Sequence, residues 1–211
     1  MKKYSLILFD MDGTIVDSDQ MLYHSLYALY DKFNNGIRKP EKELVKYSGP
    51  LIEESLKKEF PNIDISITLG EYIKQAAHYS YLIKPMENII SVLKELKNKG
   101  VKTGIVTNKH TKNAIKALKA TNMEGLFDIL IGFDEVVNHK PAKDGILKAM
   151  ELLNIKDKSE VLYVGDNNVD HYTAENAGVD SALINWGPRC NSLVVAPTYK
   201  IDKFDELLEV N

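Results

Sequence analysis

The sequence predicts an α/β protein with a parallel sheet, helices on both faces of that sheet, and a small all-helical block inserted after the first strand. Three observations support this prediction. An apolar run at residues 5–9 ends abruptly in Asp10 and a Gly turn, as a buried strand of such a sheet does. Residues 19–83 carry helical apolar patterns and, apart from an ambiguous patch at 63–67, no alternation typical of strands. After residue 85, helix and strand patterns alternate strictly.

Length and composition restrict the class of protein. The chain has 211 residues, which allows one large domain or one domain with an insert. Its net charge of −3 offers no basic surface for nucleic acid. No apolar segment is long enough to cross a membrane. Asp10 interrupts the first apolar run before it could complete a signal peptide, so we expect a cytoplasmic protein.

Two scarce residue types narrow the possible sites further. The single cysteine, Cys190, excludes an intramolecular disulfide framework and a cysteine zinc site. The only arginines are Arg38 and Arg189. A bidentate guanidinium clamp on a phosphate would therefore have to come from one of these two side chains.

The helical block contains four helical patterns. They span residues 19–33, a short stretch after Pro40, 51–60 and 69–83. Helices this short need a shared apolar face, so we expect them to form a compact bundle. The sequence thus predicts two units, a core of residues 1–16 and 86–211 and an inserted domain of residues 17–85.

The remaining chain alternates between the two kinds of element. The patterns predict helices from 89 to Gly100, at 111–121, at 142–153 and at 169–177, and strands at 101–107, 127–131, 161–165 and 181–185. Such alternation favours a parallel sheet with helices on both faces.

Four carboxylates follow two of these strands. Asp10 and Asp12 leave the first strand on the same side, at the sheet edge where ligands bind in open α/β folds. Two carboxylates held together repel each other unless a cation or proton intervenes, which suggests Mg²⁺. Asp166 and Asp170 follow the strand at 161–165 and, four residues apart, share one face of a helix.

Polar residues also follow the other strands. Thr107 and Asn108 stand at a helix start, which suits an anion such as phosphate, and Lys140 precedes Pro141. Each feature has an ordinary explanation as an acidic turn, a helix cap or a solvated lysine. Their common location at the carboxyl ends of strands favours a single functional crevice.

The order of these motifs resembles the haloacid dehalogenase superfamily of phosphohydrolases over essentially the whole chain. DMDGT at 10–14, VTN at 106–108, KP at 140–141 and GDNNVD at 165–170 resemble its four motifs. The resemblance implies a Rossmann-like core with a helical cap at 17–85. TNK at 107–109 and Asn185-Trp186-Gly187 resemble the phosphoglycolate phosphatase-like branch. Asn167 stands where Ser or Thr is commoner, but no carboxylate is lost, so we expect activity to be retained.

The resemblance also implies a role for each catalytic residue. Asp10 would be the nucleophile that forms an aspartyl-phosphate. Asp12 would protonate the leaving oxygen and then activate water. Thr107 and Lys140 would stabilise charge on the phosphoryl oxygens, and Asn108 would join them in binding the substrate.

A metal site is implied by the same resemblance. Mg²⁺ would be bound by Asp10, by the backbone carbonyl of Asp12 and by Asp166. Asp170 would stand behind them and hold a metal-bound water or Lys140. The residues thus predict Mg²⁺ as the cofactor.

The implied function is a Mg²⁺-dependent phosphatase of small phosphorylated metabolites, with specificity set by the loop at 48–54. Phosphoglycolate, pyrophosphate, a sugar phosphate and a nucleoside monophosphate all remain possible substrates. A dehalogenase proper needs no metal and lacks an acid at Asp12. A phosphoglucomutase-like enzyme usually has an arginine in the cap loop, where this chain has Ile52. A catalytically silent binding protein on the same fold is a further alternative.

Overall fold

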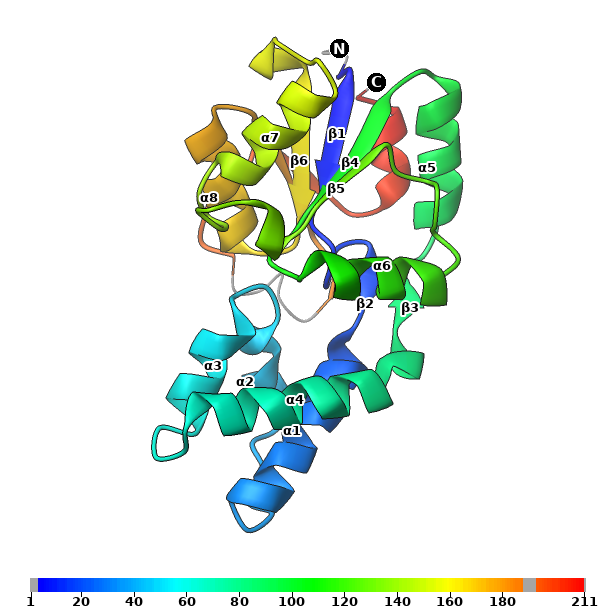
Figure 1. Ribbon diagram of the computed structural model, residues 1–211. Coiled ribbons are helices and arrows are strands. Elements are labelled where there is room, and N and C mark those ends of the chain that lie inside the picture. Colours follow the sequence, from blue (N-terminus) through cyan, green and yellow to red (C-terminus); the bar gives the residue numbers. More distant parts are fainter. Residues whose placement is uncertain (1–3, 188–192, 211) are drawn as a thin grey trace.

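The centre of the protein is a six-stranded parallel sheet, seen edge-on in the upper half of the computed structural model in Figure 1. The structure describes residues 4–187 and 193–210, so Arg189 and Cys190 lie outside the described residues. The strand order is β5-β4-β1-β6-β7-β8. The strands are β1 (Leu6–Phe9), β4 (Lys102–Val106), β5 (Ile129–Ile131), β6 (Val161–Gly165), β7 (Asp180–Ile184) and β8 (Tyr199–Ile201). This sheet confirms the predicted fold class.

Helices cover both faces of the sheet. They are α5 (Ile89–Asn98), α6 (Thr111–Ala120), α7 (Asp144–Leu152) and α8 (Asn168–Ala177). Helices α5 and α6 and the 3-10 helix η6 (Phe204–Leu208) share one apolar core with the sheet, and α7 and α8 share the other. Figure 1 shows α5 and η6 on one side of the strands and α7 and α8 on the other.

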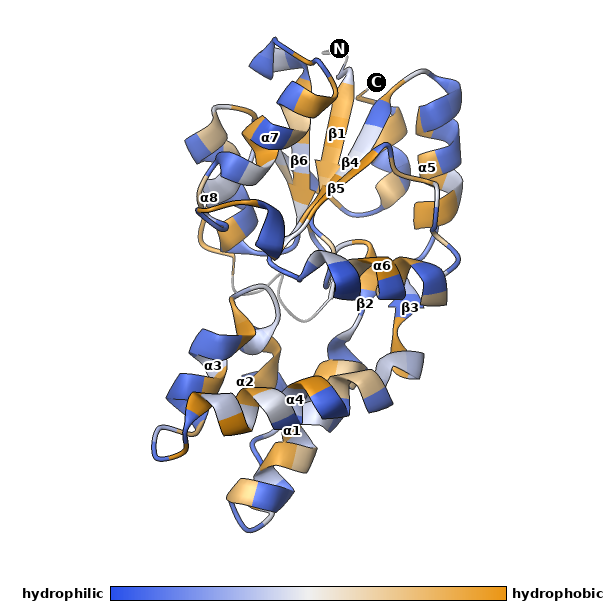
Figure 2. Cartoon of the chain, viewed as in Figure 1, coloured by the Kyte–Doolittle hydropathy of each residue, from blue (hydrophilic) through white to orange (hydrophobic). Residues whose placement is uncertain are grey.

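Strand β1 lies in the middle of the sheet and contributes to both cores. Ile7 and Phe9 join the core under α5, whereas Leu6 and Leu8 join the core under α7 and α8. All four side chains are fully buried. A strand covered on both faces needs a continuous apolar run, which explains the uninterrupted apolar character of β1 in Figure 2.

The inserted helices lie beyond the carboxyl ends of the strands, in the lower half of Figure 1. They are α1 (Asp19–Phe33), α2 (Glu41–Leu44), α3 (Ile52–Glu59) and α4 (Ile65–His78). Their buried side chains, among them Leu26, Leu29 and Leu56, form a core of their own. Two short strands, β2 (Val16–Asp17) and β3 (Lys84–Pro85), pair where the chain enters and leaves this block. We propose from this arrangement that residues 17–85 form a separate cap domain.

Several boundaries differ from the prediction. Helix α4 begins at Ile65 because Asp64 caps it, with the Asp64 carboxylate accepting the Ser66 amide at 2.7 Å. The ambiguous patch at 63–67 is therefore a helix start. The helix predicted at 69–83 ends earlier, at His78, and the 3-10 helix η2 (Ser80–Leu82) follows it. The edge strand β8 and η6 were not predicted.

The other short helices are η1 (Val45–Tyr47), η3 (Phe133–Glu135) and η4 (Lys158–Glu160). Within the described residues, none of the helices combines the length and the apolar character that crossing a membrane requires.

Candidate active site

Three aspartates meet where β1 and β6 end. Asp10 follows β1, Asp166 follows β6, and Asp170 lies in the first turn of α8. Because β1 and β6 are neighbours in a parallel sheet, their carboxyl ends bring these residues together. One carboxylate oxygen of each lies within 4.8 Å of the others, and all three residues are buried.

Lys140 connects two of these carboxylates. Its Nζ lies 2.7 Å from Asp10 Oδ1 and 2.8 Å from Asp170 Oδ1. Burial lowers the pKa of Lys140, but the two aspartates outweigh burial and raise that pKa well above its usual value. Burial raises the pKa of Asp10 to about 6, against the opposing effect of Lys140. Lys140 is therefore a buried cation in the site and not a solvated surface lysine.

Asp170 is held by backbone as well as by Lys140. Its Oδ2 accepts hydrogen bonds from the amides of Asp166 at 3.1 Å and Asn167 at 3.0 Å. A Cβ on Gly165 would lie 2.2 Å from the Asp170 Cβ, so glycine is needed for this approach. Asp170 therefore fixes both the loop that carries Asp166 and the ammonium group of Lys140.

Asp12 has a lysine of its own. Lys109 Nζ lies 2.7 Å from Asp12 Oδ1 and 2.5 Å from Oδ2. Burial raises the pKa of the Asp12 carboxyl, but Lys109 outweighs burial and the pKa is lowered. Lys109 was not among the predicted site residues. Its position directly after Thr107-Asn108, at the carboxyl end of β4, was the available signal.

Thr107 and Asn108 line the same site. The buried Thr107 hydroxyl oxygen accepts the Lys109 amide at 3.2 Å. Asn108 Oδ1 accepts the Lys140 amide at 3.1 Å, while its Nδ2 lies 3.5 Å from the Gly49 carbonyl oxygen of the inserted block. Asn108 thus ties the backbone of Lys140 to the loop that follows η1. A substrate-binding role for Asn108 stays a prediction.

A cavity of about 330 Å³ opens from these residues toward the inserted helices. Asp10, Asp12, Thr107 and Lys109 line its inner end. Ser48, Gly49, Pro50 and Ile52 of the loop predicted to set specificity also line it. The site therefore lies between the sheet and the inserted block.

The donor atoms suit a hard divalent cation. Asp10, Asp166 and Asp170 offer only carboxylate oxygens, and the Thr14 hydroxyl donates to Asp166 Oδ1 at 3.2 Å. Magnesium and calcium prefer such oxygen donors. The single Lys140 ammonium group cannot balance three buried carboxylates held this close, and a bound cation would relieve the remaining repulsion. These residues could therefore hold a metal ion.

Fold and site together describe a hydrolase whose aspartates lie at the carboxyl edge of a doubly covered parallel sheet. Residues 7–184 match the family model of the haloacid dehalogenase-like hydrolases. The chain belongs to this family, which confirms the predicted resemblance and the prediction of an enzyme of phosphatase type.

Individual relatives align over nearly their whole length. Pyrophosphatase PpaX of Halalkalibacterium halodurans is 30% identical over 97% of this chain and 95% of its own. A protein of Caldanaerobacter subterraneus subsp. tengcongensis, provisionally given the same name, is 33% identical over 99% of this chain and 94% of its own. A crystal structure from Lactobacillus plantarum, provisionally named phosphoglycolate phosphatase, superimposes with a TM-score of 0.87 at 21% identity, covering 99% and 100% of the two chains. The last comparison concerns the fold alone.

Proposed function

We propose that this chain is a Mg²⁺-dependent phosphatase that hydrolyses small phosphate monoesters through an aspartyl-phosphate on Asp10. The observation that carries the proposal is the arrangement of Asp10 and Asp12. Asp10 lies 2.7 Å from the Lys140 ammonium group, and both aspartates line the cavity. A nucleophile and an acid–base group are thus available to one bound phosphate.

The reaction proceeds in two displacements at phosphorus. An oxygen of the Asp10 carboxylate attacks phosphorus, and the bond to the leaving oxygen breaks as that oxygen takes a proton from Asp12. In the second step Asp12 removes a proton from water, whose oxygen attacks phosphorus and frees the Asp10 carboxylate. Inorganic phosphate and the free alcohol are the products.

Two lysines adjust the charge of the site during these steps. The ammonium group of Lys140 and the hydroxyl group of Thr107 stabilise the phosphoryl oxygens. In the absence of substrate, Lys109 keeps Asp12 ionised through their ion pair. An anionic substrate competes with Asp12 for Lys109, which lets Asp12 take up the proton that it later donates.

Asp10, Asp166 and the backbone carbonyl of Asp12 would hold the metal ion. The buried oxygen donors of Asp10 and Asp166 support this assignment. Asp170, engaged by two amides and Lys140, stands behind them as a positioning residue. When bound, Mg²⁺ neutralises the carboxylates that face a phosphate dianion and orients the transferred group.

The position of the cavity under the inserted helices favours small substrates. The inserted helices stand over the carboxyl edge of the sheet, and a lid in this position excludes water and commits the substrate. The space of about 330 Å³ suits a metabolite and is too confined for a folded phosphoprotein.

Pyrophosphate is the strongest alternative substrate, since two relatives carry the name pyrophosphatase. The same two displacements at Asp10 would serve it. Ile52, at the place where phosphoglucomutase-like enzymes usually have arginine, disfavours that activity. The set of charged groups around Asp10 disfavours a silent binding protein.

The proposal is tested by measuring phosphate release from p-nitrophenyl phosphate, a panel of phosphorylated metabolites and pyrophosphate, with Mg²⁺ and with chelator. We expect release that depends on Mg²⁺. Absence of release from every compound in the presence of Mg²⁺ would contradict the proposal and favour a binding protein.

A further inference from the structure

The side chains that line the cavity between the sheet and the cap indicate what kind of leaving group it can hold. We propose that the natural substrate is a phosphate monoester whose leaving group has a predominantly apolar body, and not a second phosphate. This inference rests on the proposed phosphatase function and specifies its substrate class.

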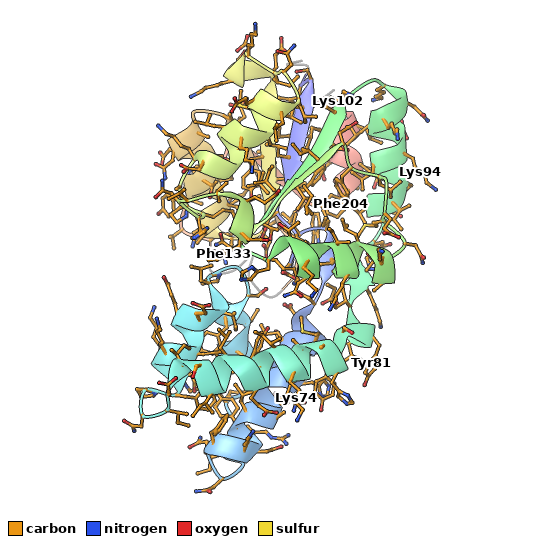
Figure 3. All side chains as sticks on the ribbon, viewed as in Figure 1. Lys74, Tyr81, Lys94, Lys102, Phe133 and Phe204 are labelled. Atoms are coloured by element: carbon orange, nitrogen blue, oxygen red, sulfur yellow. The ribbon has the colours of Figure 1, made fainter. Side chains whose placement is uncertain are left out.

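The wall that the cap contributes is predominantly apolar, although Ser18, Ser48 and Ser80 also line it. Helix α4 lines the cavity with Tyr72, Ile73 and Ala76, and α1 adds Met21 and Leu22. Among the described residues that line it, the cap side contributes no lysine and no arginine. Figure 3 shows side chains of α4 and α6 extending into the space between these helices. An apolar body gains free energy by leaving water for such a wall.

The size of the cavity also fits a larger leaving group. Its volume of about 330 Å³ corresponds to roughly eleven water molecules, at ~30 Å³ each. The transferred phosphoryl group occupies only the inner end, at Asp10 and Thr107. Most of the space therefore remains for the rest of the substrate.

This volume belongs to a cap whose loop already touches the core. Asn167 Nδ2 lies 3.4 Å from the Ser48 carbonyl oxygen, and Asn108 Nδ2 lies 3.5 Å from that of Gly49. A Cβ on Gly49 would lie 2.8 Å from Asn167 Nδ2, so the loop packs closely against the core at this point. The volume of the cavity therefore does not arise from a loop that stands away from the core.

A second phosphate would find little to compensate its charge. Lys109 lies at the inner end, where the transferred phosphoryl group draws it from Asp12, and Lys116 lies exposed on α6 at the opposite wall. Burial raises the pKa of Tyr72, with the negative charge of Asp12 adding to the effect, so this phenol remains a neutral donor. Placing an anionic leaving group against the cap wall would cost its hydration without a cation in return.

The test compares substrates of equal chemistry and different apolar area. Ethyl, butyl and hexyl phosphate have leaving groups of similar pKa, so differences in kcat/KM report how the body is bound. We expect kcat/KM with Mg²⁺ to rise at least about tenfold from ethyl to hexyl phosphate, given the gain from each buried methylene. We also expect hexyl phosphate to exceed pyrophosphate.

A pair of variants locates the effect on α4. Ala76→Asp places a charge in the cavity wall and should abolish most of the chain-length dependence. Lys74→Asp, on the exposed side of the same helix, should leave the dependence unchanged.

Each outcome bears on one of the two proposals. Equal kcat/KM for the three alkyl phosphates, or a higher value for pyrophosphate, would overturn the apolar leaving group and leave the phosphatase proposal standing. Full retention of the dependence of kcat/KM on chain length in Ala76→Asp would also overturn the apolar leaving group. Absence of Mg²⁺-dependent hydrolysis for every compound would overturn the phosphatase proposal itself.

Discussion

Each of the two aspartates of the DxD motif is paired with a different lysine. Lys140 contacts Asp10, and Lys109 contacts both carboxylate oxygens of Asp12. The pKa of Asp10 is raised to about 6 by burial, whereas Lys109 overcomes burial and lowers the pKa of Asp12. Neighbouring carboxylates with pKa values moved in opposite directions are suited to separate roles in one reaction.

The nucleophile is tested by Asp10→Asn. An amide is a poor nucleophile, so turnover of p-nitrophenyl phosphate should fall by at least about 1000-fold. The measurement is the steady-state rate with Mg²⁺, together with the circular dichroism of the folded variant.

Asp205→Asn, in η6 and outside the site, is the matched control and should keep wild-type activity. A rate for Asp10→Asn within tenfold of wild type would refute covalent catalysis by this residue.

Glu59 at the end of α3 organises the packing of the cap. Its carboxylate accepts hydrogen bonds from Tyr30 at 2.7 Å and from Lys39 at 2.6 Å, and the Tyr47 hydroxyl also donates to it. Tyr47 directly precedes the loop of Ser48 and Gly49 that touches the core. Glu59 therefore connects the packing of the cap to the position of that loop.

We expect Glu59→Gln to lower the free energy of unfolding by about 1–3 kcal/mol at pH 7, since it weakens hydrogen bonds to a charged acceptor. Burial raises the pKa of Glu59, but Lys39 and the two tyrosines outweigh it and lower that pKa. Because the pKa of Glu59 is lower in the folded state, the ionised carboxylate stabilises the fold at pH values above the unfolded pKa of ~4.3. This stabilisation is lost as the pH falls through the folded-state pKa. In urea unfolding, the difference in free energy of unfolding between Glu59→Gln and wild type should therefore be smaller at pH 3.5 than at pH 7.

Glu53→Gln, on the exposed face of α3, is the control and should change stability by less than about 0.5 kcal/mol. A Glu59→Gln difference that grows toward acid would contradict this account of the network.

Gly49 is tested by substitution with alanine. Its φ of +100° and the approach to Asn167 Nδ2 both disfavour a Cβ. Gly49→Ala should push the loop from the core and lower kcat/KM at least about tenfold, because misplaced groups in a closed site are costly.

Gly70→Ala, in the middle of α4 with nothing within 4 Å of the added Cβ, should keep activity and raise stability by about 0.5–1 kcal/mol. Equal activity of the two alanine variants would indicate that the contact of the loop with the core does not matter for catalysis.

The residues that the parallel sheet brings together could be predicted from the sequence. Asp10, Thr107 and Asp166 follow three adjacent strands, so their convergence depends only on topology. The pairing of Lys109 with Asp12 depends on side-chain direction beyond the strand ends, which periodicity does not encode. The contact of Asn108 with Gly49 joins residues 59 positions apart. The three-residue strand β8 is too short for a pattern to indicate it.

Dependence on metal is a property of the assembled site. Removal of metal with EDTA should lower activity by more than about 100-fold, and added Mg²⁺ should restore it, because the carboxylates then face an incoming phosphate without neutralisation. Ca²⁺ should support activity poorly, since its looser coordination disturbs in-line geometry. The measurement is the hydrolysis rate against the concentration of each ion. Full activity in chelator would contradict the carboxylate site.

The decisive measurement is detection of the covalent intermediate on Asp10. Asp12→Asn removes the group that activates water, whereas p-nitrophenolate leaves without needing a proton. Mixing this variant with p-nitrophenyl phosphate and Mg²⁺ should give a burst of about one p-nitrophenolate per enzyme, followed by slow turnover. Acid quenching and borohydride reduction should then convert residue 10 to homoserine, detected by mass spectrometry of the peptide. Covalent catalysis by Asp10 would be contradicted if the wild-type enzyme turns over substrate while neither protein is modified at residue 10. Modification of another residue would contradict it as well.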